Sequence, residues 1–558
     1  MCDFSKDGRS SVIARSEATQ QSCFLLFSIA AGAIWFYVLA TTAVDRVNLS
    51  YMPMVGEMPP AFWAGFALLV LATAAWYFSP RTKAVHFLLL LQWTLYLFVA
   101  PELVQVNARG KDAIDHVVTG VLYLTEGNFT EFCYSSFPGF TFFLAFIKEI
   151  AGGITLPELE RLASPLLHLG RSAGLGFLFL CLFKSRKQAL FAALLATSLF
   201  WVQEQLDPCP QHMGIVLFLF FFGVYMRLGM HPVTRRLLLF ILYAGMVVAH
   251  PLSSFLAFLM AAFLYLLNRF VKKPVAGGEI MGRHALVLVF GVFFVAWLLY
   301  SSDWVFTDAV KSLRFFLQEP AIGFTVLKSY SAYHHHVVRL IYAFYGLVLV
   351  WLVILLWRKE FWSPVKLERL FPLLCMSVSV YPVLSGLWNI GRAYLFAAPF
   401  LAWFLTRESF IKKRINRLAF VFLVLLLPFN YIERYSAEYI YNVPTGEFSA
   451  AGFMCRGVPP ERVVLIGRTS APSPSSLAGT LYQPVILDGS AFLKPGRKFD
   501  FAADSSRNRN LILFYYGEDS LRSFEETIGR QKSSVIYSNG DYQLHRFWPN
   551  PGVALQYE

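Results

Sequence analysis

Charged residues are scarce in this sequence. Lys, Arg, Asp and Glu make up 15% of the 558 residues, whereas 56% are hydrophobic and 17% are aromatic. Soluble domains carry about a quarter of charged residues, so the scarcity argues against a soluble protein and predicts a membrane protein with several spans. The net charge of +13 does not indicate nucleic-acid binding. Most basic residues fall in short runs between apolar segments, where they determine topology.

The usual signatures of nucleotide-dependent or thiol-based chemistry are also missing. The seven cysteines show neither CxxC nor zinc-ligand spacing, so they define no disulfide framework and no metal site. Nothing resembles a phosphate-binding P-loop, a dinucleotide glycine motif or a nucleophile elbow. Residues 1–22 lack the pattern of a cleaved signal peptide, and we interpret them as a disordered cytoplasmic tail. These absences argue against a nucleotide-dependent reaction in the cytoplasm.

Apolar segments alternate with short basic loops along residues 23–431. A membrane helix needs about 20 apolar residues, fewer when it is tilted or buried among neighbours. Loops rich in Lys and Arg tend to stay in the cytoplasm, so the pattern predicts about 13 spans with the N-terminus inside. The expected spans are 23–44, 61–79, 84–101, 164–183, 188–201, 214–228, 237–249, 252–267, 285–300, 337–357, 370–387, 393–405 and 418–431.

Two regions lie outside this series of spans. Residues 102–163 form a large outer loop if the short apolar stretch 140–150 lies along the membrane surface or is re-entrant. If that stretch crossed the bilayer, the KSRK run at 184–187 would face outward, against the positive-inside tendency. Residues 432–558 contain short β-rich runs at 463–466, 484–487, 511–516, 534–537 and 542–547, and a helical pattern at 520–531. The predicted fold class is therefore mainly α, a polytopic transmembrane helical bundle with a small C-terminal extracytoplasmic α/β domain.

The outer loop carries the densest group of polar residues. Asp112, Asp115 and His116 lie on one face if the segment is helical, because three- and four-residue spacings stack. Two carboxylates on one face could act as a general base or coordinate a divalent cation through oxygen. The alternative is a solvated amphipathic helix on the membrane surface, with its apolar face toward lipid.

Further candidates lie near the outer ends of the expected spans. Asp207 and Gln211 flank prolines at the start of one span, and His250 precedes a proline at an outer turn. Such prolines free backbone groups that a polar pocket can use, although they also serve simply to begin helices. Arg392 begins a span and could hold a phosphate through its planar guanidinium group. Arg171 is an intramembrane charge, which suggests a functional site unless the side chain snorkels to the interface.

In their order along the chain, several short motifs resemble those of the C-type glycosyltransferase superfamily, especially its bacterial and archaeal multi-span relatives. The motifs are DAIDH, EGNF and SSFPG in the outer loop, then DPCPQHMG, HPLSS, GRAYLFAAPF, TGEFSAAGFMCRGVPPERVVLIG and SSVIYSNGDYQLHRF. The resemblance implies a polyprenyl-phosphate-linked sugar donor and an essential acidic residue in the first large outer loop. By position that role falls on Asp112 or Asp115, with His116 adjacent. The chain lacks a WWDYG-like signature, which speaks against oligosaccharide transfer to asparagine.

These features together predict an inverting membrane glycosyltransferase of the cell envelope, located in the plasma membrane among membrane lipids. It would transfer a hexose or pentose from a lipid-linked donor to a glycan, lipid or protein acceptor, with no nucleic-acid partner. Asp112 or Asp115 would serve as base, with Arg392 and Arg171 on the phosphate. The sequence does not decide whether the reaction uses a divalent cation. The alternatives are a transporter or flippase, for which two related halves are expected and not found in the sequence, and a non-catalytic envelope-assembly protein.

Overall fold

The computed structural model describes residues 5–45, 47, 53–79, 81–106, 115–127, 135–199, 208–227, 229–270, 284–301, 343, 347, 350, 351, 390–410, 413–435 and 445–457. In the C-terminal part it describes five strands and residues 509, 519, 521, 522 and 524–526. The expected spans 337–357 and 370–387 therefore fall almost entirely outside the described residues.

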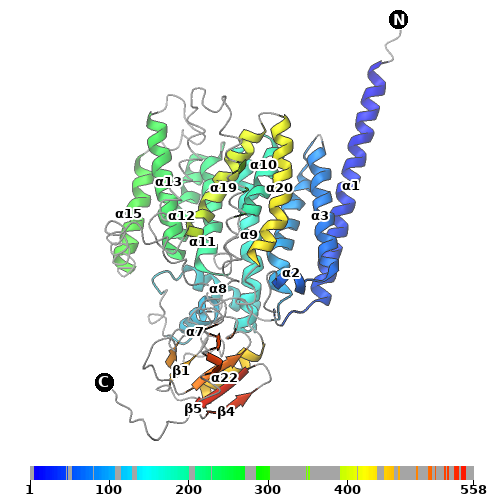
Figure 1. Ribbon diagram of the computed structural model, residues 1–558. Helices are drawn as coiled ribbons and strands as arrows, with labels where there is room; N and C mark the ends of the chain where they lie inside the picture. The colour runs from blue at the N-terminus through cyan, green and yellow to red at the C-terminus, as the bar shows by residue number, and fades with distance from the viewer. Residues whose placement is uncertain are drawn as a thin grey trace.

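Long apolar helices stand side by side and form the body of the molecule (Figure 1). They are α1 (Ser5–Thr41), α3 (Pro60–Phe78), α4 (Leu88–Thr94), α9 (Leu156–Leu182), α10 (Arg186–Leu199), α11 (Pro210–Met226), α12 (Pro232–Ala249), α13 (Pro251–Phe270), α15 (His284–Ser301), α19 (Ile390–Ser409) and α20 (Lys413–Arg434). By length and composition, six described stretches could cross a membrane, namely Thr19–Thr41, Pro60–Phe78, Ala84–Leu103, Glu158–Leu182, Pro232–Ala249 and Ile415–Ile432. The structure thus confirms a mainly helical chain with several candidate membrane spans.

Prolines fix where many of these helices begin. Pro60, Pro210, Pro232 and Pro251 each stand at the first helical position. A proline costs nothing there, because the N–H that it lacks would have no intrahelical partner. α1 behaves differently and starts at Ser5, so much of the tail predicted to be disordered is helical. The stretch from Arg9 to the first span has neither Gly nor Pro, and the helix extends through it.

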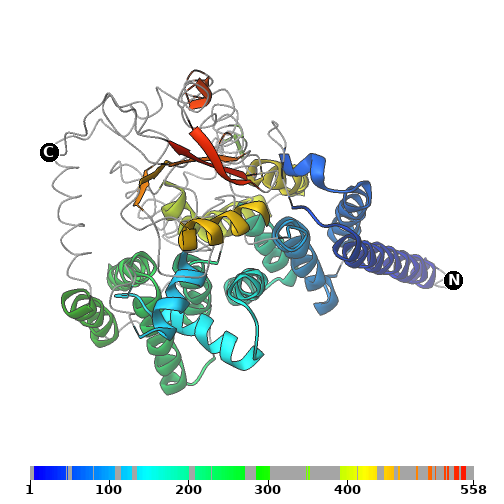
Figure 2. The same ribbon diagram turned by 90° about the horizontal axis from the view of Figure 1, so that it is seen from below.

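The N-terminus lies at one end of the bundle, and a group of short elements lies at the other end (Figure 1). The short elements are α2 (Pro53–Glu57), the π-helix η3 (Asp115–Thr119), α7 (Gly120–Thr125), α8 (Gly139–Ala151) and α22 (Thr445–Gly457). A β-sheet lies beside them, as the view from below also shows (Figure 2). We call this the sheet-side end of the bundle.

Helix α8 covers the stretch 140–150 that we expected to lie on the membrane surface. Its 13 residues make a helix of about 20 Å, well short of the roughly 30 Å of a bilayer core. Phe140 and Leu144 are buried against Val117 and Val121, whereas Phe146 is 64% exposed. Glycine at 139 brings the start of α8 against the end of α12, since a Cβ there would lie 3.1 Å from the Ala249 nitrogen. The short amphipathic helix agrees with the surface location.

The C-terminal sheet has five strands in the order β2-β1-β3-β5-β4. The strands are β1 (Val463–Leu465), β2 (Val485–Leu487), β3 (Phe501–Ser505), β4 (Ser533–Ser538) and β5 (Tyr542–Phe547). β1 pairs in parallel with β2 and β3, and β5 is antiparallel to β3 and β4. Four strands coincide with predicted runs, β3 was missed, and the run predicted at 511–516 lies outside the described residues.

Candidate functional site

The third span changes its helix type shortly before the sheet-side end. It runs through η1 (Ala84–Phe87), α4, the π-helix η2 (Leu95–Val99) and α5 (Ala100–Leu103). A π-turn leaves carbonyl groups for other donors and is frequent at functional sites. Trp35 Nε1 donates to the Leu95 carbonyl at 3.1 Å, and the Tyr435 hydroxyl donates to the Leu97 carbonyl at 3.1 Å. Side chains from the first span and from the end of the last one therefore hold this turn.

Glu102 follows the π-turn and is 8% exposed. Its Oε1 accepts a hydrogen bond from Arg434 Nη2 at 3.1 Å and lies 3.2 Å from His168 Nε2. Its Oε2 accepts a hydrogen bond from Ser164 Oγ. Ser164 and His168 are one turn apart on α9, and Arg434 ends α20. Both carboxylate oxygens are thus engaged by groups from two other helices.

Two guanidinium groups lie on the same aromatic ring beside this carboxylate. The Cζ atoms of Arg171 and Arg434 lie 4.2 Å and 5.0 Å from the centroid of Phe98, and the His168 ring stacks on Phe98 at 5.1 Å. Arg171 and Arg434 are both fully buried. Burying a charge is costly unless it is paired, so a cluster of this kind in an apolar bundle is expected to have a function. We call Glu102, His168, Arg171 and Arg434 the charged cluster.

The first turn of α11 borders the charged cluster. His212 is fully buried, and its ring centroid lies 4.7 Å from that of His168. Gln211 is 3% exposed. Within the part of the chain that the structure describes, the side-chain polar atoms of Gln211 and His212 have no hydrogen-bond partner.

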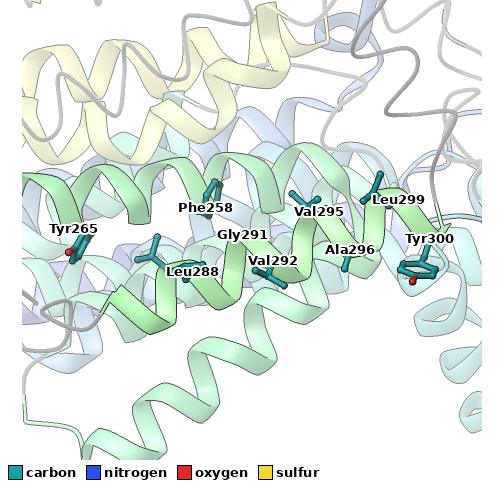
Figure 3. Close-up of a pocket in the computed structure, with 10 residues that line it drawn as sticks. Phe258, Tyr265, Leu288, Gly291, Val292, Val295, Ala296, Leu299 and Tyr300 are labelled. Atoms are coloured by element: carbon teal, nitrogen blue, oxygen red, sulfur yellow. The ribbon is translucent and has the colours of Figure 1, made fainter.

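An apolar groove between α13 and α15 is the other candidate binding surface (Figure 3). It has a volume of about 670 Å³, and its lining includes Phe258, Gly291, Val295 and Tyr300. Gly291 allows the two helices to approach, because a Cβ there would lie 3.0 Å from the Phe258 ring. The lining contains no charged residue, so this groove suits a hydrocarbon chain rather than bond-making chemistry.

The predicted site residues are distributed over several places. Arg171 lies within the charged cluster, and Gln211 lies at its border. His116 is buried in the neighbouring η3–α8 region, with its ring 6.4 Å from Phe140. His250 lies at the junction of α12 and α13, where its Nδ1 is 2.8 Å from Ser253 Oγ in the first turn of α13. That contact matches the alternative in which His250 punctuates the helices.

For the remaining predicted residues, the side chains lie outside what the structure describes. Asp112 and Asp207 lie outside the described residues. Asp115 begins η3 and Arg392 lies in the first turn of α19, and for both the structure describes the backbone only. Over the described ranges, no group of three or more His, Cys, Asp and Glu is placed to hold a metal ion.

Glu102 and Arg434 were missed by the sequence analysis. Both stand just beyond the apolar runs of expected spans, at 84–101 and 418–431. Glu102 falls in the predicted outer loop 102–163, and Arg434 falls at the start of the predicted C-terminal domain 432–558. The sequence nevertheless contains an indication that the two residues could meet. They have opposite charges and follow spans that were expected to run in the same direction.

Replacing Tyr435 with Phe should lower the stability of the protein. The variant loses the hydroxyl that satisfies the buried Leu97 carbonyl, and an unsatisfied buried acceptor costs about 1–3 kcal/mol. Thermal unfolding of the full chain in detergent measures the loss. The control is Tyr243→Phe, because the buried Tyr243 hydroxyl has no hydrogen-bond partner among the described residues. Equal effects of the two substitutions would contradict a role for Tyr435 in holding the π-turn.

Comparison with known proteins finds no matching protein family and no matching curated relative. Among solved structures, the chain is similar to an oligosaccharyltransferase of Archaeoglobus fulgidus crystallised with Zn and sulfate, at 13% identity and a TM-score of 0.44, over 79% of this chain and 70% of that one. It is similar to AglB of the same organism in complex with an inhibitory peptide and a dolichol-phosphate, at 10% identity and a TM-score of 0.46, over 80% and 71%.

A third similar structure is ArnT from Cupriavidus metallidurans bound to undecaprenyl phosphate, at 10% identity and a TM-score of 0.45, over 86% of this chain and 98% of that one. Two of these three structures are oligosaccharyltransferases of one organism, and the third is bound to undecaprenyl phosphate. Because all three TM-scores are below 0.5, these similarities do not identify the function, which depends on this chain's own residues.

Proposed function

We propose that this protein is a membrane glycosyltransferase that takes a sugar from a polyprenyl-phosphate donor and transfers it to an acceptor on the extracytoplasmic face. The observation that carries the proposal is the charged cluster at the sheet-side end of the bundle. Intramembrane charges mark sites for polar substrates by default. Asp115 and His116, the last two residues of the DAIDH motif, begin η3, which packs against α7 and α8. These two helices lie at the sheet-side end (Figure 1).

The cluster suits a leaving phosphate. Transfer from such a donor breaks the bond between the anomeric carbon and a phosphate oxygen, which leaves with the electron pair. Preorganised cations stabilise the developing charge most effectively where water is excluded. Arg171 and Arg434 supply two guanidinium groups in that setting, and Arg392 is proposed to join them from the start of α19.

Glu102 is better suited to positioning these cations than to taking a proton. Its two oxygens already accept from Arg434 and Ser164, and Oε1 also contacts His168. The base is therefore proposed to be Asp112 or Asp115, which takes the proton of the acceptor hydroxyl as that oxygen attacks the anomeric carbon with inversion. His116, Gln211, Asp207 and His250 are proposed to border the substrates, although His250 also caps a helix.

The proposed sidedness places the N-terminus and the basic loops in the cytoplasm. The turn from α9 to α10, which includes Lys184, lies at the end of the bundle away from the sheet (Figure 1). About 13 spans would then leave residues 102–163 and 432–558 outside. This orientation puts the charged cluster near the outer surface, where a donor presented in the outer leaflet can reach it.

Sided labelling of cysteines tests this orientation. In intact cells, a membrane-impermeant maleimide should label the exposed Glu126→Cys, whereas Ser185→Cys should react only after permeabilisation. The unaltered chain is treated with the same maleimide, as the control for labelling of its native cysteines. Among the native cysteines, Cys455 should remain unlabelled, because burial raises the pKa of its thiol to about 11 and keeps it protonated at neutral pH. The reverse labelling pattern would place the charged cluster at the cytoplasmic face.

The activity itself is tested with membranes containing the protein and a panel of radiolabelled polyprenyl-phosphate sugars. The proposal predicts that at least one sugar of the panel leaves the lipid for an endogenous acceptor, and that membranes without the protein do not support this transfer. Retention of every label on its lipid would argue against the proposal.

A further inference from the structure

The first turn of α11 carries backbone N–H donors that have no acceptor within the helix. Pro210 occupies the first helical position, and the N-cap residue Cys209 makes no side-chain cap. The leading N–H groups of a helix have no intrahelical acceptor, so those of Gln211 and His212 point out of the helix end. The helix dipole adds a partial positive charge at this end.

The side chains of the same two residues are buried without partners. The amide atoms of Gln211 and both ring nitrogens of His212 are shielded from solvent, and none of them has a hydrogen-bond partner among the described residues. Burying a polar group without a hydrogen bond costs about 1–3 kcal/mol in proteins. Two adjacent buried side chains in this state, both in the first turn of a helix, indicate a place for a ligand.

The surroundings favour an anionic ligand. The His212 ring lies 4.7 Å from the His168 ring, and Arg171 follows His168 by three residues on the same face of α9. The Glu102 carboxylate, which would repel an anion, is engaged by Arg434, His168 and Ser164. Helix N-termini with uncapped N–H groups are ready-made sites for phosphate.

We infer that the N-terminus of α11, with the side chains of Gln211 and His212, is a binding site for a phosphate oxyanion beside the charged cluster. The inference rests on the proposed function for its source of phosphate, the head of the polyprenyl-phosphate carrier. Free inorganic phosphate has the same chemistry and is the other possible source. The backbone N–H groups and the Gln211 amide donate to the phosphate oxygens, and Arg171 supplies the nearby positive charge.

Binding measurements on the full-length protein in detergent test the site. The probes are radiolabelled polyprenyl phosphate, the matching polyprenol without phosphate, and inorganic phosphate monitored through thermal stabilisation. Gln211→Glu keeps the shape of the side chain but adds a negative charge, and His212→Leu removes the imidazole. Loss of charge-assisted hydrogen bonds should weaken polyprenyl-phosphate binding by about 10- to 100-fold, with no effect on polyprenol.

The matched control is His86→Leu. His86 is also a buried imidazole, and its Nε2 has no hydrogen-bond partner among the described residues. It lies in η1 at the start of the third span, whereas Glu102 lies at the end of that span. The His86→Leu variant should bind polyprenyl phosphate as tightly as the unaltered protein. This result separates a binding effect from a general loss of stability. Gln211→Met serves as a second variant if Gln211→Glu does not fold, and it should weaken binding by about tenfold.

The outcomes separate this inference from the proposed function. If the unaltered protein binds polyprenyl phosphate and the Gln211 and His212 variants bind it equally well, the site is wrong and the proposed function stands. If only inorganic phosphate stabilises the unaltered protein and Gln211→Glu abolishes that effect, the site is right and the proposed donor is wrong. If the unaltered protein binds neither probe, both are overturned, and the first turn of α11 holds only water.

Discussion

Replacing Glu102 with Gln is expected to lower the free energy of unfolding by about 3–5 kcal/mol, the usual cost of breaking a buried ion pair from one side. The change keeps the size of the side chain and removes the charge that offsets Arg434. The new amide nitrogen would also lie next to an existing donor in either orientation of the side chain. It would face Arg434 and His168 in one orientation and the Ser164 hydroxyl in the other. Sugar transfer should fall at least 100-fold, because the cations lose the group that positions them.

Thermal unfolding in detergent and transfer in membranes are the two measurements. Glu158→Gln is the matched control, because that exposed residue forms a capping box with Thr155 and glutamine also serves in such a box. It should leave the unfolding temperature nearly unchanged. Equal stability of Glu102→Gln and Glu158→Gln would contradict the view that the charged cluster holds the sheet-side ends of the spans together.

Adding Arg434→Met to Glu102→Gln should cost less than the sum of the two single changes. Each single variant leaves a buried charge without its counter-charge, whereas the double variant removes both charges. Additive losses in the same unfolding experiment would mean that the 3.1 Å contact between Arg434 and Glu102 contributes little net energy.

The second large effect is expected at the aspartates of the outer loop. Asp112→Asn and Asp115→Asn each keep the shape of the side chain and remove the capacity to accept a proton. A general base contributes about 10²–10⁴-fold to a reaction. We expect at least one of the two variants to lose transfer by that factor at unchanged protein level, and Asp112 is the first candidate. The protein level in membranes and the rate of transfer are measured together.

Glu149→Gln is the control, since Glu149 is an exposed carboxylate on α8 in the same outer region. It should leave transfer unchanged. Full activity of both aspartate variants would remove the base from the proposed mechanism. If that result came with an inactive but folded Glu102→Gln, the search for the base would move to the charged cluster.

The local patterns of the sequence predicted what depends on neighbouring residues. The apolar runs gave the helices, the prolines at 210 and 251 marked helix starts, and the short 140–150 stretch became α8. Arg171 was predicted to be an intramembrane charge, and the structure buries it against Phe98. The HPLSS turn was interpreted as either a pocket wall or a helix boundary, and the His250–Ser253 contact agrees with the boundary.

Features that depend on distant residues could not be predicted in this way. Glu102 and Arg434 are 332 residues apart, and no local periodicity reports that they meet. The π-turn lies within the uniformly apolar run LYLFV, and partners from two other spans hold it. Strand β3 has the sequence FAADS, which is poor in β-forming residues and becomes a strand through pairing with β1 and β5.

The central claim is that this protein breaks the bond between a sugar and a lipid phosphate. The most direct measurement uses the purified protein in liposomes with a polyprenyl-phosphate sugar labelled in both the sugar and the phosphate. The proposal predicts that the two labels separate, with the phosphate retained on the lipid and the sugar on an acceptor, and that Asp112→Asn or Asp115→Asn prevents the separation. Labels that stay together while the donor crosses the bilayer would show a flippase and contradict the claim.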